Sequence, residues 1–174
     1  DRALFYAEDR TLEIANVDAV KDFKKGYSVV KFTALKSDGT PGTDTGFADT
    51  DFFFFRVAEA YLAYAEATAR LNGGNATPQG VIYLDELRSR SHATPRGSYT
   101  LIDILDERSR EFYFEGQRRT DLIRFNRFGG NNNYNWSWKG GAPNGRNFEA
   151  GRNLFPIPAT ELSVNGNLKQ NPDY

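Results

Sequence analysis

Three glutamates spaced four residues apart are the clearest candidates for chemistry in this chain. On one helix, Glu107, Glu111 and Glu115 would project from successive turns, with roughly 5–6 Å between neighbouring positions. That spacing is close to the separation of the two carboxyl groups in a retaining glycosidase. It therefore raises the hypothesis of a helical glycoside hydrolase that uses two of the three glutamates.

Arginines beside these glutamates favour a structural role instead. If one helix runs through Gly116, four charged residues fall on the same flank of it: Arg108, Glu111, Glu115 and Arg118. Each i,i+3 pair of opposite charge contributes about 0.2–0.5 kcal/mol at a surface, and more is at stake where the pair is partly buried. An acid catalyst needs a raised pKa, whereas a neighbouring arginine lowers it. We therefore predict a structural ion-pair ladder and no catalytic residues.

The composition narrows the remaining classes of protein. A formal charge of −1, from 22 basic and 23 acidic residues, gives no electrostatic reason to expect nucleic acid or an anionic membrane as partner. With no cysteine and only His92, the chain lacks the residues for a thiolate or multi-histidine metal site, and we predict no metal and no cofactor. No apolar run is long enough for a transmembrane segment.

The helical elements follow from periodicity and end signals. The first helix is expected over residues 51–72, with Asp51 as its cap and Gly73-Gly74 as its stop. Its apolar stripe is rich in alanine: Ala58, Tyr61, Leu62, Ala65 and Ala69. The second helix is expected over residues 77–91, where a Thr-Pro pair marks the start. The third begins with a capping box at Thr100 and Asp103 and continues towards residue 126, with Gly116 as a candidate point of interruption. Because only four residues link the first two helices, they should form an antiparallel hairpin of the tetratricopeptide (TPR) kind.

The ends of the chain are predicted to be less regular. Short strands are expected at 3–6, 11–14 and 27–33, and a helical turn at 160–164. The predicted fold class is mostly α, with TPR-like antiparallel helical hairpins, a small N-terminal β-hairpin element and long irregular loops. We expect one region over 1–174, divided into strands and loops (1–50), helices (51–128) and a loop with an extended tail (129–174). A start at Asp1 and the absence of methionine suggest a piece of a longer protein.

The long loop contains the residues best suited to touch a ligand. Trp136 and Trp138 would point the same way if their segment is extended, and Asn135 lies between further asparagines. Aromatic faces cover the C–H faces of sugars, and amides match neighbouring hydroxyl groups. The alternative is that the tryptophans anchor the loop to the protein. Ligand binding by Asn135, Trp136 and Trp138 is therefore a hypothesis beside an anchoring role.

Four segments together resemble one known family. They are RVAEAYLAYAEA (56–67), ILDERSREFYFEGQRRTDLIRF (104–125), LFPIPATEL (154–162) and QNPDY (170–174). In these segments the chain is similar to the C-terminal part of SusD/RagB-family proteins. The resemblance extends over nearly the whole chain, and the second, third and fourth segments are its most specific parts.

The resemblance implies a non-catalytic role. Members of this family are lipoproteins of the outer membrane of Bacteroidetes, exposed on the cell surface, that bind glycans, or in some cases peptides. They deliver these nutrients to a SusC-like TonB-dependent transporter, and their sugar-stacking aromatic residues lie mostly upstream of the part matched here. Two other hypotheses stay open: the helical glycosidase described above, and a TPR-type module that binds a peptide or a protein.

Overall fold

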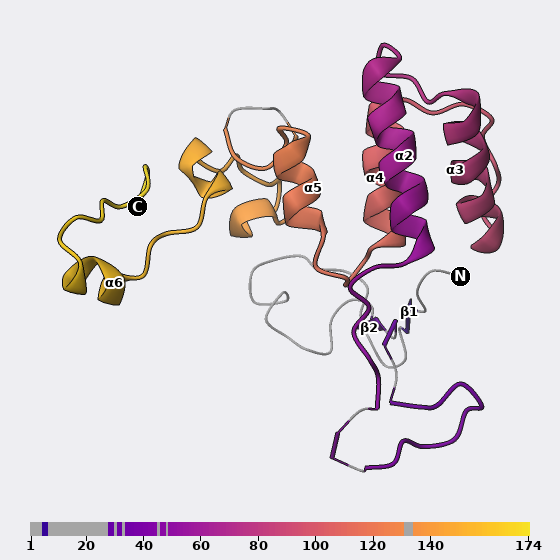
Figure 1. Ribbon diagram of the computed structural model, residues 1–174, viewed down its shortest axis with the longest axis horizontal. Coiled ribbons are helices and arrows are strands. Elements are labelled where there is room, and N and C mark those ends of the chain that lie inside the picture. Colours follow the sequence, from indigo (N-terminus) through magenta and orange to yellow (C-terminus); the bar gives the residue numbers. More distant parts are fainter. Residues whose placement is uncertain are drawn as a thin grey trace. The chain divides into compact units, whose positions relative to one another are not determined.

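The computed structural model describes residues 5–6, 28–29, 31–32, 34–44, 46–47, 49–130 and 134–174 (Figure 1). The chain divides into two compact units, whose boundary in the helical region falls between Gly116 and Gln117. The described residues are mostly helical, as predicted. The small β element consists of β1 (Phe5–Tyr6) paired antiparallel with β2 (Ser28–Val29). The strand expected at 11–14 lies outside the described residues.

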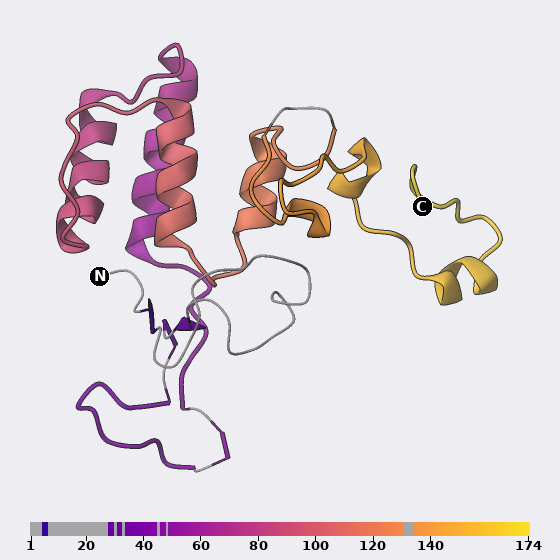
Figure 2. The ribbon, with the colours of Figure 1, turned by 180° about the vertical axis from the view of Figure 1, so that it is seen from behind.

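Three helices form the body of the first unit: α2 (Val57–Leu71), α3 (Pro78–Arg90) and α4 (Leu101–Glu111). Helix α2 packs against both others, and the views from the front and from behind show the three side by side (Figures 1 and 2). The start of α4 is tied to the turn between α2 and α3, because Leu101 N donates to Gly74 O at 2.9 Å. Helices α3 and α4 therefore both run antiparallel to α2, and α2 with α3 forms the predicted hairpin.

Alanines on α2 make close helix packing possible. Ala58, Ala65 and Ala69 are buried on the same face as Leu62, as the spacing predicted. On the facing helix, a Cβ added at Gly80 would lie 3.4 Å from Ala65 Cα, so the two backbones approach closely there. The remaining core residues come from α3, from α4 and from the segments that flank α4: Leu84, Leu87, Tyr99, Ile104 and Phe112.

Helix α2 begins six residues later than predicted. Its N-cap is Arg56, which is extended with φ −150° and ψ 159°, and no side chain caps the helix. Asp51 is therefore not the cap. Two physical reasons account for the difference: consecutive aromatic residues have poor helix propensity, and the Arg56 side chain is held by the distant Glu115 carboxylate.

The starts of α3 and α4 are confirmed. Thr77 accepts a hydrogen bond from Gly80 N at 3.3 Å, and Pro78 occupies the first turn. Thr100 and Asp103 form the predicted capping box, in which Asp103 Oδ2 accepts from Thr100 N at 2.8 Å. The prediction of one helix towards residue 126 is wrong, whereas an interruption near Gly116 is correct.

Helix α4 ends at Glu111 because the backbone that follows leaves the helical region. Phe114 has φ 62° and Gly116 has φ 77°, both in the left-handed region that favours glycine. A second helix, α5 (Arg118–Arg124), then begins in the second unit. The premise of the ladder, a helix continuous through Gly116, is therefore incorrect.

The second unit is built from short elements. After α5 it contains two 3₁₀ turns, η1 (Lys139–Gly141) and η2 (Ala150–Asn153), and then α6 (Ala159–Val164). Helix α6 confirms the predicted helical turn in the tail. An isolated parallel bridge joins Gly129 to Phe148, which closes the long loop between them.

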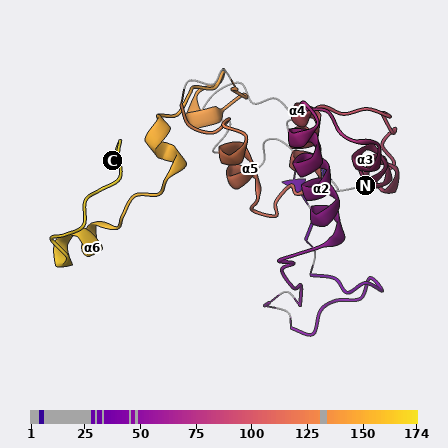
Figure 3. The same ribbon diagram turned by 45° about the horizontal axis from the view of Figure 1, so that its top comes forward.

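The ribbon of the tail, drawn in yellow, runs through α6 to the C-terminus (Figure 3). Side chains of the last five residues bond to the segment before α6. The Gln170 amide both accepts from Ile157 N at 2.8 Å and donates to Ile157 O at 2.9 Å. Asp173 accepts from Gly151 N at 2.7 Å, and the Tyr174 hydroxyl donates to Leu154 O at 2.9 Å. The LFPIP and QNPDY segments are thus partners in one structure, which explains physically why both belong to the same sequence signature.

Within the described ranges, no helix combines the length and the apolar character needed to cross a membrane.

Candidate functional site

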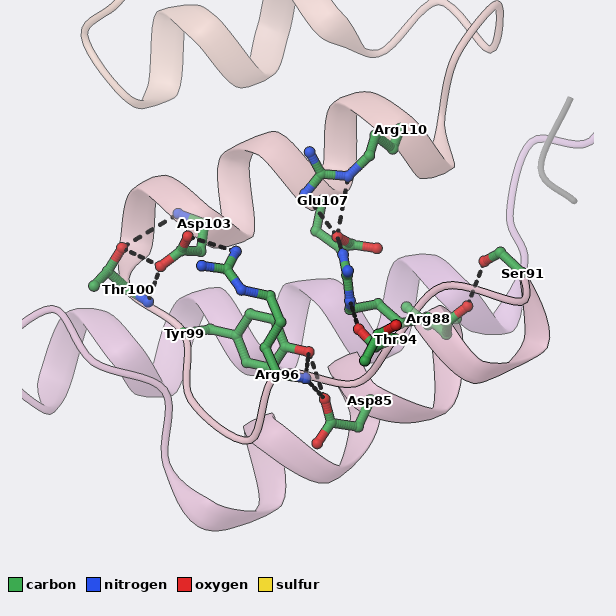
Figure 4. A network of polar contacts seen from close by, with 11 residues as sticks. Asp85, Arg88, Ser91, Thr94, Arg96, Tyr99, Thr100, Asp103, Glu107 and Arg110 are labelled. Carbon is green, nitrogen blue, oxygen red and sulfur yellow. Dashed lines mark hydrogen bonds and ion pairs between the residues drawn. The ribbon is translucent and has the colours of Figure 1, made fainter. Parts of the chain in front are cut away.

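Glu107 lies at the centre of a polar network on the first unit (Figure 4). Its side chain is fully buried, and Oε2 accepts from Arg88 Nη1 at 2.9 Å and from Arg110 Nη2 at 2.8 Å. Arg88 is fixed in turn, because its Nε donates to Thr94 O at 2.8 Å. Two guanidinium groups thus make charge-assisted hydrogen bonds to a single buried carboxylate.

The same view shows how the start of α4 is held against α3 (Figure 4). Arg96 Nη1 donates to the capping residue Asp103 at 2.8 Å, and the Tyr99 hydroxyl donates to the Asp85 carboxylate. Burial, together with this hydrogen bond, raises the pKa of Tyr99 to about 12. The phenol therefore stays protonated and acts as a buried structural donor.

Glu111 and Glu115 belong to a second network, which gathers cations from distant parts of the first unit. Arg56 donates to Glu115 through Nε and Nη2, at 2.9 and 2.8 Å, and also pairs with Glu111 Oε1. Arg90 reaches Glu111 Oε1 at 2.5 Å, and Lys31 reaches Glu115 Oε1 at 2.5 Å. We call these five residues the Arg56 network.

The Arg56 network also stabilises the end of α4. Glu111 O, a carbonyl of the last turn, accepts from Arg56 Nη2 at 2.8 Å and from Lys31 Nζ at 2.8 Å. Carbonyl groups at a helix C-terminus have no partner within the helix and attract cations. Two cations from outside the helix thus satisfy the carbonyl at which α4 stops.

The geometry argues against acid catalysis by the three glutamates. Glu107 and Glu111 are 0% and 1% exposed, and each carboxylate is already engaged by two arginines, which leaves neither to act on a glycosidic bond. Burial alone would raise the pKa of Glu115, but hydrogen bonds from Arg56 and Lys31 lower it below the usual value. A glycosidase needs one carboxylic acid that is protonated near neutral pH, and a lowered pKa opposes this.

A cavity of about 640 Å³ adjoins the Arg56 network. Its wall includes Phe32, Leu35 and Phe53 on an apolar side, and Lys36 and Asp51 among its polar groups. This volume falls within the range of small-ligand pockets, roughly 300–1,000 Å³. No sequence pattern pointed to this cavity, because its walls come from segments far apart in the chain.

The tryptophan loop of the second unit is organised around Lys139. This lysine is 2% exposed, and its Nζ donates to Tyr134 O at 2.9 Å while lying 4.9 Å from the Trp136 ring centroid and 5.2 Å from that of Phe148. Burial lowers the pKa of Lys139. Lys139 could not be identified from the sequence, because a lysine beside glycines gives no sign of burial.

The two tryptophans differ in their surroundings. Trp136 is 42% exposed and packs edge-on against Tyr134, with ring centroids 6.2 Å apart. Trp138 is half-buried and has φ 68°, so the segment is not extended there and the expected alternation of side chains does not apply. Asn135 is exposed beside Trp136, whereas Asn131–Asn133 lie outside the described residues.

Arg118, a residue of the predicted ladder, contacts the tryptophan loop. Its Nη2 donates to the Tyr134 hydroxyl at 2.9 Å. Arg108 lies over the Phe112 ring, with Cζ 5.0 Å from the centroid, and is 4% exposed. The four residues of the predicted ladder are thus buried or half-buried and make polar or aromatic contacts. Its two glutamates, however, form ion pairs with residues outside the ladder: Lys31, Arg56 and Arg90.

Metal ligation has no support in this geometry: among the residues that the structure describes, no group of three histidine, cysteine, aspartate or glutamate side chains could hold an ion.

The helical fold with its irregular second unit is found in solved proteins. A SusD superfamily protein from Parabacteroides distasonis matches with a TM-score of 0.68 and 23% identity, over 86% of this chain and 32% of that one. Surface glycan-binding protein A from Bacteroides uniformis matches with a TM-score of 0.57 and 30% identity, over 69% of this chain and 27% of that one.

The sequence comparisons name the family directly. The SusD family model matches residues 17–174. The starch-binding protein SusD of Bacteroides thetaiotaomicron is 42% identical over the whole of this chain and 31% of its own length, and a SusD-like protein of Bacteroides ovatus is 31% identical over 51% of this chain and 17% of its own length. The chain belongs to the SusD family, as its motifs predicted. It spans less than a third of the length of these two relatives.

Proposed function

We propose that this chain is the C-terminal helical part of a glycan-binding protein of the bacterial cell surface. The observation that carries the proposal is 42% identity over the full chain to a protein named for starch binding, together with similarity to a surface glycan-binding protein. In this proposal the first unit is a scaffold, and binding involves no bond cleavage. The whole protein is a lipoprotein of the outer membrane that delivers its glycan to a SusC-like TonB-dependent transporter.

Within this chain, Trp136 is the proposed contact with the glycan, and Asn135 is the proposed hydrogen-bonding neighbour. Support comes from the exposure of Trp136, at 42%, and from its fixed position between Tyr134 and Lys139. A prepositioned aromatic ring costs little entropy when a sugar stacks on it. Trp138, being half-buried, is assigned to support of the loop.

Calorimetry on the full-length parent protein tests the proposal. Because the relative binds starch, maltoheptaose and soluble amylopectin are the first glycans to titrate, followed by other soluble polysaccharides. We expect measurable affinity for one class without release of reducing ends. Turnover of a polysaccharide that a Glu115→Gln change abolishes would instead support the glycosidase hypothesis.

Two matched variants locate the contact. Trp136→Ala should weaken glycan binding by roughly 1–2 kcal/mol, because it removes a stacking ring. Trp138→Ala should lower the melting temperature and leave the affinity of the folded protein unchanged. Full affinity in the Trp136→Ala variant would show that the loop is not a glycan contact, while glycan binding by the parent could still hold.

Delivery to a transporter needs a separate measurement. The parent should co-purify with a SusC-like TonB-dependent transporter of the same organism when both are expressed and solubilised from membranes. Recovery of each protein alone under these conditions would contradict the transport partner and leave glycan binding standing.

A further inference from the structure

Four consecutive phenylalanines, Phe52–Phe55, lie exposed immediately before α2; we call them the phenylalanine run. They are 56%, 61%, 79% and 85% exposed in chain order. With about 200 Å² for each fully exposed ring, the run presents roughly 550 Å² of apolar surface. This already matches the largest apolar patch of a typical soluble monomer, about 300–600 Å².

The rings of the run face more than one direction. Phe52 stacks on Phe32 with centroids 6.2 Å apart and meets Phe54 edge-on at 6.0 Å. Phe53 instead lines the cavity beside the Arg56 network. A segment that is apolar on both sides is typical of chain buried on both sides, since a half-buried strand alternates apolar with polar residues.

The run is also held firmly at one end. Arg56, the next residue, bonds to Glu115 at 2.9 and 2.8 Å and lies 4.7 Å from the centroid of the Phe112 ring. The end of the run that enters α2 is therefore fixed by a bidentate ion pair and an aromatic contact. A partner that covers the run meets a positioned surface and loses little of the binding energy to ordering.

We propose that the phenylalanine run is the docking surface for the region of the longer protein that lies outside this chain. The relatives supply the size of that region: the chain spans 31% of SusD and 32% of the solved Parabacteroides protein, so about two thirds of each lies elsewhere. With Phe32 and Leu35, which are 38% and 52% exposed, the apolar surface approaches the roughly 800 Å² that each side of a stable interface buries.

The chemistry of the surface favours an apolar protein partner over a sugar. Phenylalanine offers neither a hydroxyl nor an indole N–H to a glycan, and the nearby cations Lys31 and Arg56 are already bonded to Glu111 and Glu115. If the partner is a region of the same polypeptide, each phenylalanine run has one copy of its partner attached to it, at high effective concentration. The inference rests on the proposal that the parent protein is longer, but not on the identity of its glycan.

Thiol labelling tests the docking surface. Because these 174 residues contain no cysteine, Phe55→Cys in the full-length parent places one assignable thiol in the run. Ser89→Cys, at an exposed polar position of α3, is the matched control. The rate of maleimide modification, followed on the peptide that carries each thiol, should be at least about tenfold slower for Phe55→Cys than for the control in the folded parent. In denaturant the two rates should become equal.

Hydrogen exchange gives an independent measurement on the unaltered parent. Backbone amides of residues 52–55 should exchange slowly, although the exposed run in this chain predicts fast exchange. Equal labelling of the two thiols in the folded parent, or fast exchange across the run, would overturn the proposal. Protection that appears only with added maltoheptaose would assign the surface to glycan, and protection lost on dilution would assign it to a second copy. Loss of glycan binding with protection intact would contradict the proposed function alone.

Discussion

Removal of Arg56 is expected to destabilise the first unit strongly. Its guanidinium makes the two hydrogen bonds to Glu115, at 2.9 and 2.8 Å, one to Glu111 O at 2.8 Å, and the ion pair with Glu111 Oε1. The side chains involved are 23% exposed for Arg56, 1% for Glu111 and 9% for Glu115. Loss of one partner therefore leaves two carboxylates in a poorly solvated site.

The magnitude follows from what remains after the change. Breaking a buried ion pair costs about 3–5 kcal/mol. Glu111 keeps Arg90 and Glu115 keeps Lys31, each at 2.5 Å, so Arg56→Ala belongs at the lower end, about 3 kcal/mol. For a chain of 174 residues this corresponds to a fall in melting temperature of roughly 6–12 °C. Arg56→Lys, which keeps the charge but loses the bidentate geometry, should fall between this variant and the wild type.

Urea denaturation followed by circular dichroism at pH 7 measures the effect, and Arg96→Ala is the matched control. Arg96 also pairs with a carboxylate, but its side chain is 46% exposed and that of Asp103 is 24% exposed. An exposed pair of this kind contributes less than about 1 kcal/mol. If Arg56→Ala costs no more than Arg96→Ala, the Arg56 network does not stabilise the fold and the argument from burial is refuted.

Three further outcomes are expected. The pKa of the Glu115 carboxyl is lowered in the folded protein, so its ionised form stabilises the fold above the pKa of the unfolded state. This stabilisation is lost as the pH falls through the pKa of the folded state. The difference in unfolding free energy between wild type and Glu115→Gln should therefore shrink below about pH 4 in urea titrations. Thr100→Ala removes the cap of α4 and should cost about 1 kcal/mol in the same assay, whereas Thr100→Ser should be nearly neutral. At Gly145, with φ 72°, an added Cβ would lie 2.4 Å from Trp136 O, so Gly145→Ala should change the tryptophan fluorescence of the loop, and an unchanged spectrum would contradict the close approach.

Prediction from sequence succeeded where the cause is local. The cap at Thr77, the capping box of Thr100 with Asp103 and the glycines after α2 act within a few residues of themselves. The antiparallel hairpin followed from linker length, and the alanine stripe of α2 followed from helical periodicity. The family was recognisable from motifs such as LFPIP and QNPDY, which the structure joins by hydrogen bonds between the Gln170 side chain and the Ile157 backbone.

The partners of the buried charges followed only from the tertiary structure. Nothing in the sequence near Arg56 indicates that its partners are Glu111 and Glu115, more than fifty residues away, because that pairing requires α2 to pack against α4. The contacts of Arg56 with α4 also explain why α2 begins at Val57 and not near Asp51. Burial of Lys139 likewise depends on rings contributed by both sides of the loop.

What the sequence by itself determined is therefore the set of helices, their caps, the hairpin and the family. What only the tertiary structure decided is which charges meet, where α2 begins and which tryptophan stays exposed. The physical reason is the range of the interactions: capping and periodicity act within one or two helical turns, whereas burial and ion pairing between distant residues exist only after the elements have packed.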